Sequence, residues 1–205
     1  MNAADPQNGG PSDVGLWDRT KAGDGGAFAE LYRRHERAVL NHAFRRTGSW
    51  QQAEDITSLV FLETWRQRDR PSVEVTLLPW LLGVANNIVR HQNRSLRRHR
   101  AAMDRINSHI SEPDHSDDVA QRIDDERQMA AVREAMSSLT RVEQETVALC
   151  VWAGLSYSEA ATAMRVPIGT VRSRLARART RLKTTTAPTA PALKAVFATE
   201  EVTHD

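Results

Sequence analysis

Cysteine is almost absent from this 205-residue chain, which contains only Cys150. A single thiol excludes an intrachain disulfide and a zinc site made of several cysteines, so a reducing compartment is expected. Aromatic residues are also scarce, at 5% of the sequence, while hydrophobic residues make up 40%. This composition predicts one or two small helical domains with mainly aliphatic cores.

Long apolar runs are absent as well. The longest, LLPWLLGVA at 77–85, is far shorter than the roughly 20 residues that a membrane-spanning helix needs. The opening residues, MNAADPQNGGPSD, lack the basic stretch and the apolar stretch of a secretory signal. The sequence therefore predicts a cytoplasmic protein without membrane insertion.

Net charge is low, at +2, but the charge is unevenly distributed. Segments 78–101 and 165–183 contain several arginines and no acidic residue, whereas 104–126 is mostly acidic. This alternation predicts an all-α protein with two small basic helical domains joined by a flexible acidic linker. The expected parts are a disordered tail at 1–14, a first domain at 15–101, the linker at 102–127, a second domain at 128–183 and a C-terminal tail at 184–205.

Apolar residues recur at helical spacing in both expected domains. The stripe from Phe28 to Ala43 predicts a first amphipathic helix. Serine, threonine or proline stands where a helix start is expected before each later apolar pattern. The resulting helices are expected at 50–67, 79–98, 140–154 and 156–164.

Segment 169–182, GTVRSRLARARTRL, predicts a helix that reads DNA. On a helical wheel one stripe would be buried, and small residues would lie opposite it with arginines on both sides. Small residues let a helix enter the major groove, where the flanking guanidinium groups can reach phosphates. With the short helix and turn before it, the segment predicts a helix-turn-helix. The residues of the buried stripe are Val171, Leu175, Ala178 and Leu182.

The helix expected at 79–98 also has two distinct faces. Its outer face would combine arginines with side-chain amides, and an aromatic residue lies at its edge. Such a surface suits unstacked bases, which can stack and be hydrogen-bonded on their exposed edges. A plain core position is the alternative for the aromatic residue, Trp80. The outer-face residues are Asn86, Asn87, Arg90, Arg94 and Arg97.

Several segments together resemble the extracytoplasmic-function sigma factors, which are small bacterial relatives of sigma-70. GLSYSEAATAMRVPIGTVRSRLARARTRL at 154–182, preceded by LTRVEQETVAL, is similar to their region 4. AFAELYRRHERAVLNHAFRRTGSWQQAEDITSLVFLETWR at 27–66 and PWLLGVANNIVRHQNRSLRRHR at 79–100 resemble their region 2. The resemblance implies a dissociable RNA polymerase subunit that directs transcription initiation by reading a −35 duplex and a −10 non-template strand.

The resemblance also implies partners and site residues. The partners would be promoter DNA, the β′ clamp helices and β flap of core RNA polymerase, and an anti-sigma factor. For the −35 element the implied residues are Thr170, Arg172, Ser173, Arg174, Ala176, Arg177 and Arg179. For the −10 element they are Trp80, Asn86, Asn87, Arg90, Arg94 and Arg97. For core polymerase they are Glu54, Asp55, Thr57, Ser58 and Phe61. Ser58 and Leu59 stand where the family usually has Gln-Glu, which predicts altered core binding.

Two other classes of protein are alternatives to this interpretation. A free-standing helix-turn-helix regulator would bind duplex DNA without polymerase, and its second domain would sense a ligand or form a dimer. An enzyme is not expected, because the chain has no HExxH motif, nucleophile motif or glycine-rich phosphate loop. His35 and His42 are expected in plain surface or core roles, and no cofactor or metal ion is expected.

Overall fold

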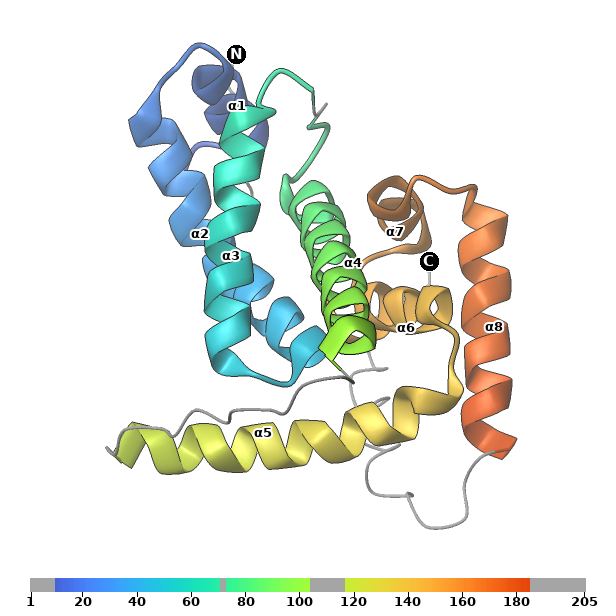
Figure 1. The fold of residues 1–205 in the computed structure, drawn as a ribbon. Helices are drawn as coiled ribbons and strands as arrows, with labels where there is room; N and C mark the ends of the chain where they lie inside the picture. The colour runs from blue at the N-terminus through green and yellow to red at the C-terminus, as the bar shows by residue number, and fades with distance from the viewer. Residues whose placement is uncertain (1–9, 71–72, 104–116, 185–205) are drawn as a thin grey trace.

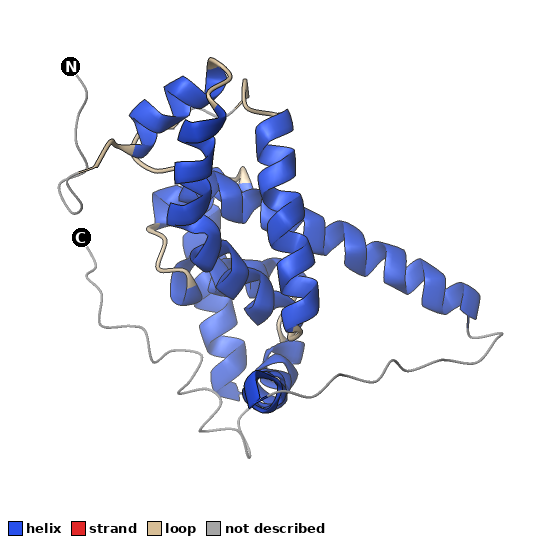
Figure 2. Ribbon diagram, turned by 90° about the vertical axis from the view of Figure 1, so that its left-hand side faces the viewer, coloured by secondary structure: helices blue, strands red, loops and turns tan. Residues whose placement is uncertain are grey.

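Helices form the described fold (Figures 1 and 2). The computed structural model describes residues 10–70, 73–103 and 117–184, except for the side chains of 93–103 and 117–119. Within these ranges no strand occurs, so the predicted all-α class is confirmed. None of the helices described there has the length and apolar character needed to cross a membrane. The first domain comprises α1 (Asp13–Lys21), α2 (Gly25–Thr47), α3 (Trp50–Arg66) and α4 (Leu78–Met103). The second comprises α5 (Asp117–Ala135), a 3₁₀ turn (Met136–Ser138), α6 (Arg141–Val147), a π-helical turn (Ala148–Trp152), α7 (Tyr157–Met164) and α8 (Ile168–Thr184).

Helix α1 begins inside the segment that the sequence assigned to a disordered tail. That boundary is wrong for residues 10–14, because Ser12 caps α1 by accepting a hydrogen bond from the Gly15 N–H. Leu16 and Trp17 are almost fully buried on the inner side of α1. Residues 1–9 and the expected C-terminal tail at 185–205 lie outside the described part of the chain.

Asp13, the first residue of α1, joins three segments of the first domain. Its carboxylate lies 2.7 Å from Arg34 Nη1 and 2.6 Å from His35 Nε2, both on α2. It also accepts hydrogen bonds from the Thr76 hydroxyl (2.9 Å) and the Leu77 backbone N–H (2.8 Å), just before α4. Asp13 is only 4% exposed, so a buried carboxylate holds α1, α2 and the start of α4 together.

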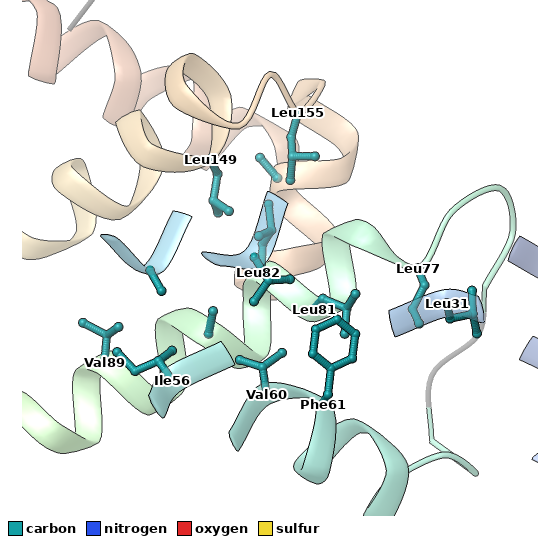
Figure 3. Close-up of a cluster of buried hydrophobic side chains, with 14 of the residues drawn as sticks. Leu31, Ile56, Val60, Phe61, Leu77, Leu81, Leu82, Val89, Leu149 and Leu155 are labelled. Atoms are coloured by element: carbon teal, nitrogen blue, oxygen red, sulfur yellow. The ribbon is translucent and has the colours of Figure 1, made fainter. Parts of the chain in front are cut away.

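The core of the first domain lies where α2, α3 and α4 pack together. Leu31 of α2, Ile56 and Val60 of α3 and Leu81 of α4 are fully buried, and Figure 3 shows them as members of one extended cluster. Their helical spacing confirms the amphipathic stripes expected from the sequence. Fully burying an aliphatic side chain contributes roughly 1.5–3 kcal/mol, so this cluster is a main source of stability.

Half of the expected linker is not a linker. Residues 117–127 belong to α5, which runs along the base of the molecule in Figure 1. Glu126 accepts a hydrogen bond from the backbone N–H of Trp50 (2.8 Å), and Arg122 lies 3.0 Å from Glu54. A carboxylate at a helix N-terminus is favourable, so α5 is fixed against the start of α3. Residues 104–116 lie outside the described residues.

The second domain confirms the predicted helix starts and turns. The Glu143 carboxylate accepts hydrogen bonds from the Thr140 backbone N–H and hydroxyl, and Ser156 and Glu159 form a capping box at α7. Arg165 ends α7 with a φ of 54°, the one non-glycine residue in the described part that adopts the left-handed conformation. This residue makes the turn between α7 and α8.

The two domains share a continuous apolar core. Leu82 of α4 faces Leu149 and Leu155 of the second domain in Figure 3, and all three are buried. Helix α7 packs directly on α4, as Figure 1 shows. The sequence predicted two separate domains, so this closed arrangement is an addition from the structure.

Candidate nucleic-acid interface

Helix α8 presents its basic face to solvent. Its inner face is made of Val171, Leu175, Ala178 and Leu182, all buried as the sequence predicted. Opposite this face, the side chains of Arg172, Ser173, Ala176, Arg177 and Thr180 are exposed. Helix propensity and the apolar stripe therefore hold one surface of α8 in the core and leave a cationic ridge outside.

The remaining −35 candidates lie on the flanks of α8, between its exposed face and its buried stripe. Thr170, Arg174 and Arg179 are half-buried. The guanidinium of Arg172 lies 5.8 Å from the centre of the Tyr157 ring, which orients it beside the turn that precedes α8. Arg181 lies 3.3 Å from the buried carboxylate of Glu143, so the end of α8 is tied to the start of α6. The structure thus keeps all seven predicted residues on one helix, with four of them fully at the surface.

A second candidate surface lies on α4. Asn87 is exposed, and Trp80 is half-buried with its ring 5.6 Å from the guanidinium of Arg165 on the second domain. These side chains, with His91 and Leu59, line a groove of about 510 Å³ between α3, α4 and α7. The indole N–H of Trp80 has no hydrogen-bond partner there. Trp80 is therefore neither a plain core residue nor a freely exposed one.

Asn86 does not lie on the outer face of α4, so that placement is wrong. The residue is 4% exposed, and its Oδ1 accepts a hydrogen bond from Nε2 of the buried His42 (3.1 Å). Helix α4 contacts α2, α3 and α7, so more than one stripe of the helix is covered. The backbones of Arg94 and Arg97 lie on α4, but their side chains fall outside the described residues.

Arg90, the last candidate on α4, is bound by an acid of the second domain. Its Nη2 lies 2.8 Å from Oε2 of Glu145, whose side chain is only 2% exposed. Arg141 approaches the other oxygen of Glu145 at 3.6 Å. Burial lowers the pKa of the nearby Arg46, while the charge of Glu145 opposes that shift. A single buried carboxylate thus gathers arginines from both domains.

The polymerase-binding candidates on α3 divide into two groups. Asp55 and Ser58 are exposed, and Glu54 is exposed but paired with Arg122. Thr57 and Phe61 are buried: the Thr57 hydroxyl donates to the Ala53 carbonyl. These two residues support the helix from inside and cannot contact a partner as the domain stands.

Two leucines on α3 complete this surface. Leu59 and Leu62 are 43% and 45% exposed and lie three residues apart, so they are neighbours on the surface of α3. In the sequence, Leu59 stands out only as a departure from the family pattern, and no motif marks Leu62. Both lie outside the buried stripe of α3, and this position on the helical wheel is the signal that could have identified them.

The described residues contain no group of three or more histidine, cysteine, aspartate or glutamate side chains placed to hold a metal ion. Burial raises the pKa of the Cys150 thiol to about 11, although the charge of Arg179 opposes the shift. The thiol is therefore protonated at neutral pH. The chemistry available on the two surfaces is that of arginines, amides and apolar side chains.

Comparison with known sequences matches each domain to a known family. The family described as Sigma-70 region 2 matches residues 31–100, and the family described as Sigma-70, region 4 matches residues 129–182. Over 139 residues the chain is 32% identical to the RNA polymerase sigma factor HrpL of Pseudomonas syringae pv. syringae, covering 68% of this chain and 76% of that protein. Over 179 residues it is 32% identical to the ECF RNA polymerase sigma factor SigE of Mycolicibacterium smegmatis, covering 84% and 67%.

Solved structures share the fold. CnrH, in complex with the cytosolic domain of CnrY, matches with a TM-score of 0.61 and 21% identity over 84% of this chain and 95% of that one. The sigma factor RpoE, in complex with the anti-sigma factor NepR from Bartonella quintana, matches with a TM-score of 0.57 and 23% identity over 77% and 94%. At these identities the likeness concerns the fold alone.

Proposed function

Since the chain belongs to the extracytoplasmic-function group of sigma-70 factors, which direct RNA polymerase to promoters, we propose that α8 reads the −35 duplex while α4 captures the −10 strand. Membership of this family means that the protein binds core polymerase and initiates transcription at specific promoters. It also favours this function over the free-standing regulator that the sequence left open. Sigma factors are initiation factors rather than enzymes, and we propose no catalytic role for this chain.

The cationic ridge of α8 is the observation that carries the −35 assignment. Ser173 and Ala176 are small and exposed at its crest, so the helix can approach base edges closely. Arg172 and Arg177 beside them can reach the phosphates that fix a helix in the groove. On α4, the exposed Asn87 and the half-buried Trp80 offer an amide and a ring to an unstacked base.

For core polymerase we propose the exposed surface of α3. Asp55 and Ser58 supply polar groups there, and Leu59 and Leu62 supply apolar area. Apolar side chains at the centre of an interface with polar groups around them are typical of protein contacts. Leu59, where the family usually has a polar residue, makes this contact more apolar than the family pattern.

We expect transcription to depend on both DNA-facing helices. In an assay with sigma-free core polymerase and genomic promoter fragments, Arg177→Ala should lower specific transcripts about fivefold or more, because one lost DNA contact costs roughly 1–3 kcal/mol. Asn87→Ala should lower promoter opening, measured by permanganate reactivity of unpaired thymines. The matched controls are Arg37→Ala and Asn41→Ala, two exposed residues of α2. Unchanged transcription in both test variants would contradict the assignment.

An anti-sigma protein is the regulator that we propose for this chain. The solved relatives of similar fold include RpoE bound to the anti-sigma factor NepR and CnrH bound to the cytosolic domain of CnrY. Because sigma factors act with RNA polymerase on DNA, we also propose that this chain works in the cytoplasm. Co-purification of a bound inhibitor from the native host, released before transcription activity appears, would test the regulator.

A further inference from the structure

Two arginines of the first domain lie next to each other on α2 and α4. His42 of α2 donates a hydrogen bond to Asn86 of α4 (3.1 Å). Arg46 and Arg90 each follow one of these residues by four positions, which is about one helical turn. Helices α2 and α4 pack together and run in the same direction, because α3 reverses the chain between them (Figure 1). The two guanidinium groups therefore lie one turn beyond this hydrogen bond, beside the second domain.

The second domain adds more arginines but only one acid. Arg90 lies 2.8 Å from Oε2 of Glu145, and Arg141 lies 3.6 Å from Oε1 of the same carboxylate. Arg133 of α5 donates to the Thr47 carbonyl at 2.5 Å. Among the described residues, Glu145 is the one carboxylate that pairs with any of these arginines. The arginine cluster is defined as Arg46, Arg90, Arg133 and Arg141.

Three buried polar atoms of this region lack a partner. Nε of Arg46, Nε of Arg90 and Oε1 of Glu145 are buried, and none of them makes a hydrogen bond with the part of the chain that the structure describes. Burial lowers the pKa of Arg46, and the charges of the other three arginines act in the same direction, while Glu145 opposes them. A buried charge normally has a counter-charge and hydrogen-bond partners. The cluster therefore needs negatively charged acceptors, and Glu145 needs one donor.

We propose that the arginine cluster binds inorganic phosphate. The unprotonated oxygens of phosphate accept strong hydrogen bonds from guanidinium groups. A P–OH group of the same ion can donate to Oε1 of Glu145, which is the one acceptor among the three unpartnered atoms. Arg90 and Arg141 are 37% and 44% exposed, so the cluster reaches solvent at one edge and a small anion can enter. This ligand goes beyond promoter recognition.

The carboxylate of Glu145 favours inorganic phosphate over other sources of the same group. Inorganic phosphate keeps a P–OH group at neutral pH. A phosphate monoester is mostly deprotonated at that pH, because its second pKa is about 6. The phosphodiesters of a DNA strand and the sulfate ion have no such proton at neutral pH. Each of these anions would place an unprotonated oxygen against the carboxylate, which is unfavourable.

Titration calorimetry of the full-length protein tests the site. Inorganic phosphate, added at pH 7 in chloride buffer of constant ionic strength, should bind saturably to one site. At one hundred times its dissociation constant, it should raise the melting temperature by about 5–10 °C. Sulfate, a nucleoside monophosphate and a single-stranded oligodeoxynucleotide without a terminal phosphate should compete at least about tenfold more weakly. Absence of saturable phosphate binding, or equal competition by one of these anions, would overturn the proposal.

Arg46→Gln should lower the affinity for phosphate at least about tenfold, because a charge-assisted hydrogen bond is lost. Without phosphate, the melting temperature of this variant should be no lower than that of the wild type, since a buried charge without its own counter-charge has been removed. Arg37→Gln, on the exposed side of α2, is the matched control and should keep the wild-type affinity. A lower melting temperature of Arg46→Gln together with unchanged phosphate affinity would show a purely structural role and refute the site.

Glu145→Gln tests the selectivity. The amide keeps the shape of the side chain but removes the charge that disfavours a fully deprotonated anion. The preference for phosphate over sulfate should therefore shrink at least about tenfold. This ratio is measured within one variant, so a general change in stability does not mimic the effect, and an unchanged ratio would refute the contact between P–OH and Glu145. None of these measurements uses duplex DNA or polymerase, so their outcome is independent of the promoter assignments.

Discussion

Asp13→Asn is expected to destabilise the protein by about 3–5 kcal/mol, the usual cost of removing one partner of a buried ion pair. The variant would leave Arg34 and His35 facing a neutral amide and would weaken the acceptor for the Thr76 hydroxyl and the Leu77 N–H. Burial alone would raise the pKa of Asp13, but the hydrogen bonds from His35 and Leu77 and the charge of His35 bring it well below its ordinary value. The carboxylate therefore stabilises the fold throughout the neutral range.

Urea unfolding at pH 7, followed by circular dichroism, measures this loss. Asp18→Asn is the matched control, because Asp18 lies on the same helix and pairs only with Lys21 in an exposed ion pair. That pair should contribute less than about 1 kcal/mol. A loss in Asp13→Asn no larger than that of the control would show that the buried carboxylate does not join the three segments energetically.

Stability is expected to fall by up to about 3 kcal/mol between pH 6.5 and pH 4 because of His42. Burial, assisted by the charge of Arg46, lowers the pKa of His42 from 6.5 to about 4, although the hydrogen bond with Asn86 opposes the shift. The unfolded chain therefore binds a proton in this window that the folded chain does not. The contribution is complete above pH 6.5 and is lost as the pH falls toward 4.

His42→Gln keeps a hydrogen-bond donor for Asn86 but cannot titrate. Its free energy of unfolding, from urea titrations at pH 7, 5.5 and 4.5, should depend less on pH than that of the wild type. His91→Gln, on the exposed side of α4, serves as the control substitution. Parallel curves for wild type and His42→Gln would refute the assignment to His42.

Local patterns predicted the parts of the site that depend on one helix. The buried stripe of α8 follows from the periodicity of Val171, Leu175, Ala178 and Leu182, and the arginines follow as the opposite face. The starts of α6 and α7 follow from capping boxes within four residues. Each of these features is determined by neighbours along the chain, which is why sequence reasoning identified them.

Features that depend on contacts between residues far apart in the chain could not be predicted from the sequence. Asn86 can be buried because His42, 44 residues away in the sequence, donates a hydrogen bond to its side-chain oxygen. Glu126 was expected in a flexible acidic linker, yet it accepts a hydrogen bond from the N–H of Trp50, 76 residues away. Periodicity cannot indicate which second helix covers a polar face, so the closed contact between the domains could not be predicted.

The shared core also has a consequence for synthesis. The ribosome completes α4 at Met103, before any residue of the second domain exists. The 61 residues from there to Met164, the end of α7, take roughly 3–12 s to translate at about 5–20 residues per second. During this interval the face of α4 that carries Leu82 and Gly83 has no covering helix from its own chain. In every newly made molecule, α4 is therefore complete before the helices that cover this face have been made.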